Sequence, residues 1–346
     1  MYDYLTSCNV DRLDSVALNY FGKKVTYRHM QEKIDACARA LTAYGVRAGD
    51  AVSLCVLAMP EAVYLLYAIN KIGAIANMLV MNATEAEIHE KLAVTESKVV
   101  ITVDLALEKI VQASKETSVK HIIGVSLAES MPCVIGTLYK WKSKIKQENC
   151  ILFSEFLKAG QGKKIDCQEI KGDAPAVIAY TGGTTGKAKG VLLSNRAANT
   201  IAFQYKYADK VLDFQKGESF LDTIPPFLAY GLFFGVHMVL CVGLENILCP
   251  DPTAERFSQQ FLKYKPNHLS GGALHIEALM KNKKVQRMNL SFAKTVAYGG
   301  DGMNQEWEDE MSKFLKSHQA SYGLMKGYGM TEVSSSSCTT FKGCDK

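Results

Sequence analysis

Segments with strand-like and helix-like patterns alternate along the first half of the chain, and this alternation restricts the fold more than any other feature. Apolar residues at helical spacing follow the capping residue Thr26, while Pro60 and the Thr84-x-x-Glu87 capping box each begin a further helix. The expected strands cover residues 51–57, 74–81, 99–103 and 121–125. Strands and helices at this spacing predict an α/β fold with a parallel sheet and helices on both of its faces.

The alternation resumes in the second half of the chain, after a less regular, lysine-rich stretch near residues 131–172. Strands are expected at residues 176–180, 191–193, 220–224, 245–249 and 295–298, and a helix is expected near 196–208. A length of 346 residues suits two units of about 150 residues each. We therefore expect a first α/β subdomain at residues 1–170 and a second at residues 171–346.

The composition excludes several classes of protein. Hydrophobic residues make up 48% and charged residues 22% of the chain, which is typical of a globular protein and not of a disordered or fibrous one. The net charge of +5 is spread along the sequence. Its densest part, Lys140 to Lys146, is interpreted as a solvated surface segment rather than a stripe that binds nucleic acid. No C-x-x-C pair and no secretory signal are recognised, so we expect a reduced, cytoplasmic protein without a nucleic-acid partner.

Residues 223–244 contain no charged side chain, and this segment is long enough to resemble a membrane span. Prolines, glycines and His237 interrupt this segment, and acidic rather than basic residues flank it at Asp222 and Glu245. A buried core helix is the favoured interpretation, with a membrane-facing segment as the alternative.

The segment Tyr180-Thr-Gly-Gly-Thr-Thr-Gly-Lys-Ala-Lys-Gly190 is the clearest functional signal. Glycines let a backbone approach an anion with its N–H groups pointing inward, threonine hydroxyls add donors, and lysines neutralise charge. This composition favours a loop that binds a triphosphate over a plain hairpin tip. It fits neither the Walker A pattern nor the G-x-G-x-x-G pattern, because the spacing differs and the segment leads into a strand instead of a helix.

This loop resembles the phosphate-binding signature of the adenylate-forming (AMP-binding) enzyme superfamily, which includes acyl-CoA synthetases. The chain departs from the usual signature at Gly182 and Ala188, where serine and proline are common. Three further segments resemble family motifs in the right order: residues 225–231 the acyl-pocket segment, 298–303 the strand end beside the adenine, and 327–332 the Y-G-x-T-E motif. The resemblance covers essentially the whole chain. It implies the large amino-terminal domain of such an enzyme, with two parallel-type sheets and helices on both faces.

The resemblance also implies roles for individual residues. Contacts to ATP are expected from Thr181, Gly182, Gly183, Thr184, Thr185, Gly186, Lys187, Lys189, Gly299, Gly300, Asp301, Tyr328, Gly329 and Thr331. Catalytic roles are expected for Thr184, Lys189, Thr331 and Glu332, and Mg²⁺ contacts for Glu332 and Thr184. The acyl pocket is expected to involve Leu228, Ala229, Tyr230, Gly231, Gly271, Gly272, Gly327 and Met330.

The implied reaction is ATP-dependent activation of a carboxylic acid to an acyl-adenylate, followed by thioester formation with coenzyme A. The apolar segment 223–244 favours a fatty or otherwise apolar acid. Two alternatives stay open, namely activation of an amino acid or acyl group for a carrier protein, and a non-catalytic nucleotide-binding remnant. Family members continue past the Y-G-x-T-E motif into a small domain that bears the adenylation lysine. No residue here matches that lysine or the ribose-binding aspartate, so we expect this chain to be poorly active alone.

Overall fold

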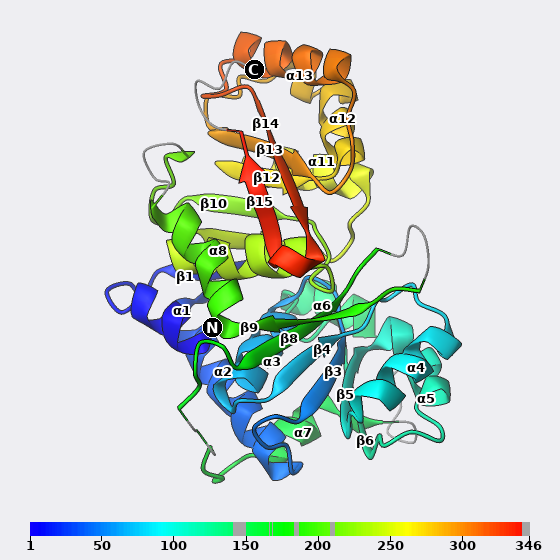
Figure 1. Ribbon diagram of the computed structural model, residues 1–346. Coiled ribbons are helices and arrows are strands. Elements are labelled where there is room, and N and C mark those ends of the chain that lie inside the picture. The colour runs from blue at the N-terminus through cyan, green and yellow to red at the C-terminus, as the bar shows by residue number, and fades with distance from the viewer. Residues whose placement is uncertain (141–149, 166, 168, 183–186, 208–211, 341–346) are drawn as a thin grey trace.

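The computed structural model describes residues 1–346 except 141–149, 166, 168, 183–186, 208–211 and 341–346 (Figure 1). Within these residues the chain forms two sheets that lie one above the other in Figure 1. The seven-stranded sheet has the order β7 (Ile151–Leu152), β6 (His121–Val125), β5 (Val99–Val103), β3 (Ala51–Cys55), β4 (Ile75–Met78), β8 (Pro175–Tyr180), β9 (Gly190–Ser194). The eight-stranded sheet has the order β15 (Ser335–Thr339), β14 (Leu324–Met330), β13 (Thr295–Gly299), β12 (His268–Gly271), β10 (Ser219–Asp222), β11 (Glu245–Leu248), β1 (Val16–Tyr20), β2 (Lys23–Thr26).

Both sheets are mainly parallel, as the strand–helix alternation predicts. Among the described strands, the antiparallel pairs are β1–β2, β8–β9 and β14–β15, and each consists of strands that follow one another directly. Antiparallel neighbours can be joined by a short turn, whereas parallel neighbours need a crossover. Two of these antiparallel connections, after β8 and after β14, lie in the part of the chain that carries the predicted functional motifs.

Helices cover the sheets on both sides, which gives alternating layers of helix and sheet. The α-helices are α1 (Tyr2–Cys8), α2 (Tyr27–Ala43), α3 (Pro60–Lys71), α4 (Glu85–Thr95), α5 (Leu107–Ala113), α6 (Cys133–Lys140), α7 (Phe153–Ala159), α8 (Asn195–Tyr207), α10 (Val239–Val242), α11 (Ala254–Tyr264), α12 (Ala273–Lys281) and α13 (Gln305–Ser317). Short 3₁₀ turns are η1 (Asp104–Ala106), η3 (Val285–Arg287) and η4 (Thr331–Val333), and η2 (Tyr230–Met238) is a π-helix.

Local signals in the sequence explain where several helices begin. The Thr26 hydroxyl accepts a hydrogen bond from the His29 N–H at the start of α2, and Pro60 occupies the first turn of α3. At α4 the predicted capping box forms in both directions, since Thr84 N–H donates to the Glu87 carboxylate at 2.7 Å and Glu87 N–H donates to the Thr84 hydroxyl at 3.3 Å. These three expectations are confirmed.

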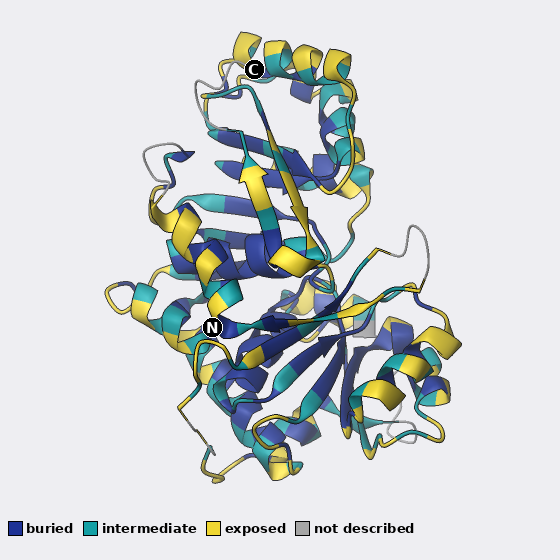
Figure 2. Ribbon diagram, in the orientation of Figure 1, coloured by how far each residue is buried: buried dark blue, intermediate teal, exposed yellow. Residues whose placement is uncertain are grey.

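The largest apolar core lies between the two sheets. It joins Leu54 and Val177 of the seven-stranded sheet to Leu18 and Phe220 of the eight-stranded sheet through the helices of the middle layer. Smaller cores lie under α4 and α5 on one outer side and under α11 to α13 on the other. Figure 2 shows this arrangement as buried strands between helices whose outer faces are exposed. The predicted two-sheet α/β fold is therefore confirmed.

Membership of the sheets does not follow the expected boundary between residues 170 and 171. Strands β1 and β2 come from the start of the chain but join the second sheet, and β8 and β9 come after the boundary but join the first. Each sheet is thus completed by strands from the other half of the sequence. A division into subdomains at residue 170 stays a prediction, and the two sheets are interleaved in sequence.

The apolar segment at residues 223–244 lies in the middle layer, as the core-helix interpretation expects. Its helical part starts only at Tyr230, after Pro225 and Pro226, and runs through η2 into α10. His237 is fully buried there, and its ring lies 2.9 Å from the Tyr67 hydroxyl and 3.1 Å from the Asn199 side-chain oxygen. Burial lowers the pKa of His237 to about 3, so the ring is neutral. No helix in the described part of the chain has the length and hydrophobicity needed to cross a bilayer.

Candidate functional site

A cavity of about 510 Å³ opens where the carboxyl ends of β13 and β14 meet the β8–β9 hairpin. In α/β sheets, ligands bind outside the carboxyl ends of parallel strands. Four of the predicted segments reach this cavity. Its wall includes Thr181, Gly182, Leu228, Ala229, Tyr230, Gly299, Gly300, Gly327, Tyr328, Gly329, Met330, Thr331 and Glu332. The fold thus brings together motifs that lie as far apart in sequence as Thr181 and Glu332.

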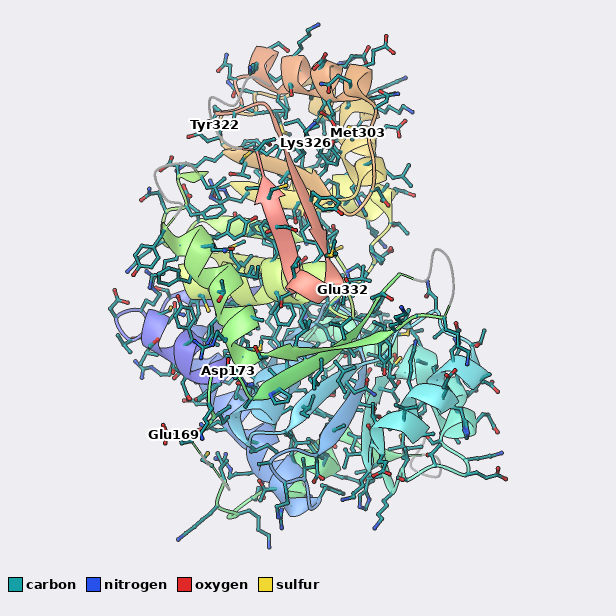
Figure 3. The ribbon with its side chains drawn as sticks, viewed as in Figure 1. Glu169, Asp173, Met303, Tyr322, Lys326 and Glu332 are labelled. Carbon is teal, nitrogen blue, oxygen red and sulfur yellow. The ribbon has the colours of Figure 1, made fainter. Side chains whose placement is uncertain are left out.

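The turn between β14 and β15 forms one side of the cavity. Tyr328 is 61% exposed, so a face of its ring is open to a ligand. Thr331 and Glu332 follow in η4, and the Glu332 side chain is exposed at the lower end of β14 (Figure 3). This places a flat aromatic surface, a hydroxyl and a carboxylate in sequence along one edge.

Aromatic side chains form a second part of the wall. Tyr230 and Phe234 come from the π-helix η2, and Tyr205 comes from α8; the Phe234 ring centre lies 5.4 Å from that of Tyr230 and 5.0 Å from that of Tyr205. The Tyr205 hydroxyl lies 2.8 Å from the Ser336 hydroxyl of β15 and so ties this wall to the turn. Burial raises the pKa of Tyr230 above its ordinary value, so the phenol stays neutral. Leu228 lies nearer the opening and is 38% exposed.

The glycine-rich loop is closed at its neck by two hydrogen bonds between the same residues. Thr181 N–H donates to the Lys189 carbonyl at 3.0 Å, and Lys189 N–H donates to the Thr181 hydroxyl at 3.1 Å. The hydroxyl of Tyr180, just before the neck, donates to the Asn77 side-chain oxygen of β4 at 2.9 Å. Burial raises the pKa of Tyr180 to about 12. The predicted contacts Gly183, Thr184, Thr185 and Gly186 lie outside the described residues.

Both loop lysines lie outside the described wall of this cavity. The Lys187 ammonium pairs with Glu90 of α4 at 3.0 Å, and both side chains are exposed, so this ion pair stabilises the fold very little. Lys189 is exposed as well. Lys187 would have to give up its pairing with Glu90 to contact a phosphate in the cavity.

Four further predicted site residues also do not line the cavity: Gly231, Gly271, Gly272 and Asp301. Gly231 packs so tightly that a Cβ atom would lie 2.5 Å from the Ile224 carbonyl oxygen, which makes it a packing glycine at the start of η2. Gly271 ends β12 and Gly272 precedes α12. A Cβ atom at Gly272 would lie 3.1 Å from the Asp301 carboxylate, so these residues form a neighbouring cluster.

Several lining residues were missed by the sequence analysis: Tyr205, Phe234, Ala297, Ser335, Ser336 and Thr339. The Ser335 hydroxyl is buried and has no hydrogen-bond partner within the described part of the chain. A buried hydroxyl without a partner costs free energy unless a ligand or water satisfies it. Serine is common in residues 334–337, and nothing in that sequence marks it as part of a strand.

Two carboxylates near the site are held in very different states. Glu332 is exposed, whereas Asp222 at the end of β10 is fully buried and accepts a hydrogen bond from the Ile224 N–H at 3.1 Å. Burial raises the pKa of Asp222 to about 8, so this group is mostly protonated at neutral pH. Among the residues that line the described cavity, Glu332 is therefore the available negative charge.

The residues present suit a magnesium ion that arrives with a nucleotide. Within the described residues, no three His, Cys, Asp or Glu side chains are grouped to hold a metal by themselves. Mg²⁺ in nucleotide sites is commonly held by one or two carboxylates, with phosphate oxygens and water completing the shell. A single exposed carboxylate at the cavity edge, Glu332, fits that pattern.

Comparison with known proteins gives one consistent family. The model of the AMP-binding enzyme family matches residues 6–346. The long-chain-fatty-acid–CoA ligase of Bacillus subtilis (strain 168) is 27% identical over 330 residues, which is 93% of this chain and 58% of that protein. The 4-coumarate–CoA ligase CCL1 of Humulus lupulus is also 27% identical, over 90% of this chain and 53% of its own length. This chain thus spans little more than half the length of these relatives.

Solved structures share the fold. The anthranilate CoA ligase AuaEII in complex with anthranoyl-AMP superposes with a TM-score of 0.84 at 19% identity, over 99% of this chain and 62% of its own. The N-terminal domain of FACL13 from Mycobacterium tuberculosis gives a TM-score of 0.80 at 19% identity, over 98% and 78% of the two chains. The resemblance drawn from the sequence motifs is confirmed by these matches.

Proposed function

This chain belongs to the AMP-binding enzyme family, and we propose that it binds ATP and an apolar carboxylic acid and joins them as an acyl-adenylate. The observation that carries the proposal is the convergence of four motifs on one cavity. An open tyrosine face, the neck of a glycine-rich loop and an exposed carboxylate all border the same space. Its volume of about 510 Å³ lies within the usual range for small-molecule sites.

We assign the adenine to the Tyr328 side of the cavity. Stacking of a base on an aromatic ring contributes about 1–3 kcal/mol. The unpartnered Ser335 hydroxyl lies in the same wall and can be satisfied by a polar atom of the nucleotide. Gly299 and Gly300 leave the end of β13 free of side chains, so a planar ring can approach the backbone there.

The phosphates then point toward the β8–β9 hairpin and η4. The carboxylate oxygen of the acid attacks the α-phosphorus, a new oxygen–phosphorus bond forms, and pyrophosphate leaves with the electrons of the broken bond. A carboxylate is already a nucleophile, so the protein has to position it and to offset the charge that develops on the phosphate. Thr331 and Glu332 line the cavity; we assign the Thr331 hydroxyl as a donor to that phosphate and the Glu332 carboxylate as the group that would hold the neutralising Mg²⁺.

The acid itself is assigned to the aromatic wall of Tyr205, Tyr230 and Phe234. This wall offers apolar surface and neutral hydroxyls, and the buried carboxyl group of Asp222 nearby is mostly protonated. It therefore suits an aliphatic or aromatic acid better than an amino acid, whose ammonium group would need a negative partner. The relatives named above are CoA ligases, so transfer of the acyl group to coenzyme A is proposed for the whole protein.

Titration calorimetry tests this assignment through binding, which does not depend on the parts found only in the longer relatives. ATP with Mg²⁺ and a set of acyl-sulfamoyl-adenosine analogues are titrated into the chain. Tyr328→Ala should weaken both by about tenfold or more, since stacking on the base is lost. Tyr207→Ala is the matched control, because Tyr207 is equally exposed but lies outside the cavity.

The alternatives predict other results. Tighter binding of an aminoacyl analogue than of alkyl or aryl analogues would favour amino-acid activation. ATP binding without pyrophosphate exchange, even when the part of the Bacillus subtilis relative that this chain does not match is added in trans, would favour a nucleotide-binding remnant. Absence of ATP binding to the parent chain would overturn the proposal.

A further inference from the structure

A second cavity, of about 580 Å³, lies between α4 and the β8–β9 hairpin. It shares Tyr180 with the nucleotide cavity, and Lys187, Ala188 and Gly190 of the same glycine-rich loop also line it, while α4 and β4 supply residues that the nucleotide cavity does not use. In Figure 1, the hairpin and α4 can be followed on the right of the molecule, where the hairpin extends past the seven-stranded sheet. The proposed nucleotide chemistry uses none of this space.

The floor of the second cavity is an apolar strip of the seven-stranded sheet. Ile178 and Leu192 are directly paired across β8 and β9, and Ile75 lies on the neighbouring strand β4. Gly190 is paired with Tyr180 and leaves the ring uncovered on that side, since a Cβ atom there would lie 3.2 Å from the ring. Apolar side chains that line a hollow of this size are typical of a small-molecule site.

A hydrogen-bonded network fixes the Tyr180 end of the floor. Beyond the Tyr180–Asn77 bond, the Asn77 amide donates to the Ser53 hydroxyl at 2.8 Å and to the Thr95 hydroxyl of α4 at 3.3 Å. Ser53 in turn donates to the Ser97 hydroxyl at 2.8 Å. The network holds α4 at a fixed distance from the hairpin, so the hollow between them is built into the fold.

The charges that line the cavity balance, with Glu87 and Glu90 against Lys91 and Lys187, but they are unequally paired. Glu90 is paired with Lys187, and Glu87 accepts two hydrogen bonds from Thr84 in the capping box. The Lys91 ammonium lies 4.3 Å from the centre of the Tyr180 ring and forms no ion pair with any carboxylate of the described residues. Lys91 is half-buried, and burial lowers the pKa of its ammonium group. A half-buried cation beside an apolar floor calls for an anion with an apolar body.

We propose that this cavity is a second binding site, for a monocarboxylate with an alkyl body, whose carboxylate pairs with Lys91 and whose chain lies on Ile75, Ile178 and Leu192. The site is separate from the nucleotide cavity, and the proposal does not depend on the proposed function. Because Tyr180 is part of both walls, a ligand here contacts the residue that precedes the neck of the glycine-rich loop.

Methyl-resolved NMR on the whole chain tests the proposal with octanoate as the probe. We expect saturable shifts of the Ile75 and Ile178 methyl signals at octanoate concentrations that leave Met330, in the nucleotide cavity, unchanged. Lys91→Ala should weaken this binding by about tenfold or more, the effect expected when a bond to a charged group is lost. Lys91→Arg keeps the charge and should retain binding close to that of the parent.

Three controls separate this result from nonspecific binding. Lys115→Ala removes an exposed lysine away from the cavity and should leave octanoate binding unchanged. Octyltrimethylammonium has the same body with the opposite charge and should bind much more weakly than octanoate. Leu192→Trp fills the exposed part of the floor and should abolish the shifts while the thermal transition is kept. Equal binding of the two probes, equal binding by Lys91→Ala, or shifts at Met330 without shifts at Ile75 would each overturn the proposal.

Discussion

Gly329 and Ser335 lie so close together across the β14–β15 turn that no side chain fits at residue 329. A Cβ atom on Gly329 would lie 1.7 Å from the Ser335 carbonyl oxygen, whereas one on Gly327 would meet no atom nearer than 3.8 Å. The two strands shift register at this point, between Tyr328 and Gly329. Glycine at residue 329 is thus required by the backbone around the proposed adenine site.

Gly329→Ala should therefore separate the two strands at the turn and displace Tyr328 and Glu332 together. We expect a loss of stability of about 1–3 kcal/mol from overpacking, and a loss of nucleotide binding. Thermal unfolding and titration with ATP measure the two effects. Gly327→Ala is the matched control for stability, because a Cβ atom there meets no close neighbour, and should keep the thermal transition. Unchanged binding in Gly329→Ala would show that the turn does not position the site.

The sequence predicts the elements whose signals are local. The strands at residues 99–103 and 121–125 are found with the expected bounds, because each is a continuous β-branched run. Three helices begin where their local sequence predicts. Thr26 and Thr84 accept hydrogen bonds from N–H groups of the first turn, and Pro60 has no N–H group that would need a partner there. These features need no information about the rest of the chain.

The other features of the fold and of the site depend on contacts between distant parts of the chain. Strand β15 is a run of serines with little β-propensity, and it forms because it pairs with β14. Tyr205 lies in the cavity wall only because α8 packs against η2 and β15. The exchange of β1, β2, β8 and β9 between the sheets likewise has no local signal. The glycine-rich motifs predicted that a site exists, while its aromatic wall had to come from the fold.

Glu332→Gln tests the proposed metal contact. The amide has nearly the same shape but no negative charge, so we expect a higher Mg²⁺ requirement and a weaker affinity for MgATP with little change in stability. Titrations of ATP at several magnesium concentrations measure this change. Glu169 is exposed and lies far from Glu332 in Figure 3, so Glu169→Gln provides the control. An identical magnesium dependence in both variants would count against the assignment.

Leu228→Trp tests where the acyl chain lies. Each buried methylene contributes about 0.8 kcal/mol, so the affinity for alkyl acyl-sulfamoyl-adenosines should rise with chain length until the cavity is filled. A larger side chain at residue 228 should shorten that limit and leave ATP affinity unchanged, because Leu228 lies at the opening on the acyl side. Leu274 is exposed and outside the cavity, and Leu274→Trp is its control. A response that does not change with chain length in the parent would reject the apolar-acid assignment.

The buried carboxyl group of Asp222 should make the free energy of unfolding depend on pH. Its pKa is about 8 in the folded chain and 3.8 in a solvated carboxyl group, so between these values the folded state binds the proton that the unfolded state releases. The free energy of unfolding should then fall as pH rises through this window, by about 1.4 kcal/mol per unit for this group, and should stop falling above pH 8. The amide side chain in Asp222→Asn is neutral at every pH. This variant should therefore lack the slope and should be more stable than the parent near pH 8. Asp173→Asn changes an exposed carboxylate and should leave the slope in place. Denaturant unfolding between pH 5 and 8 measures all three proteins, and parallel curves for the parent and Asp222→Asn would mean that Asp222 is ionised in the fold.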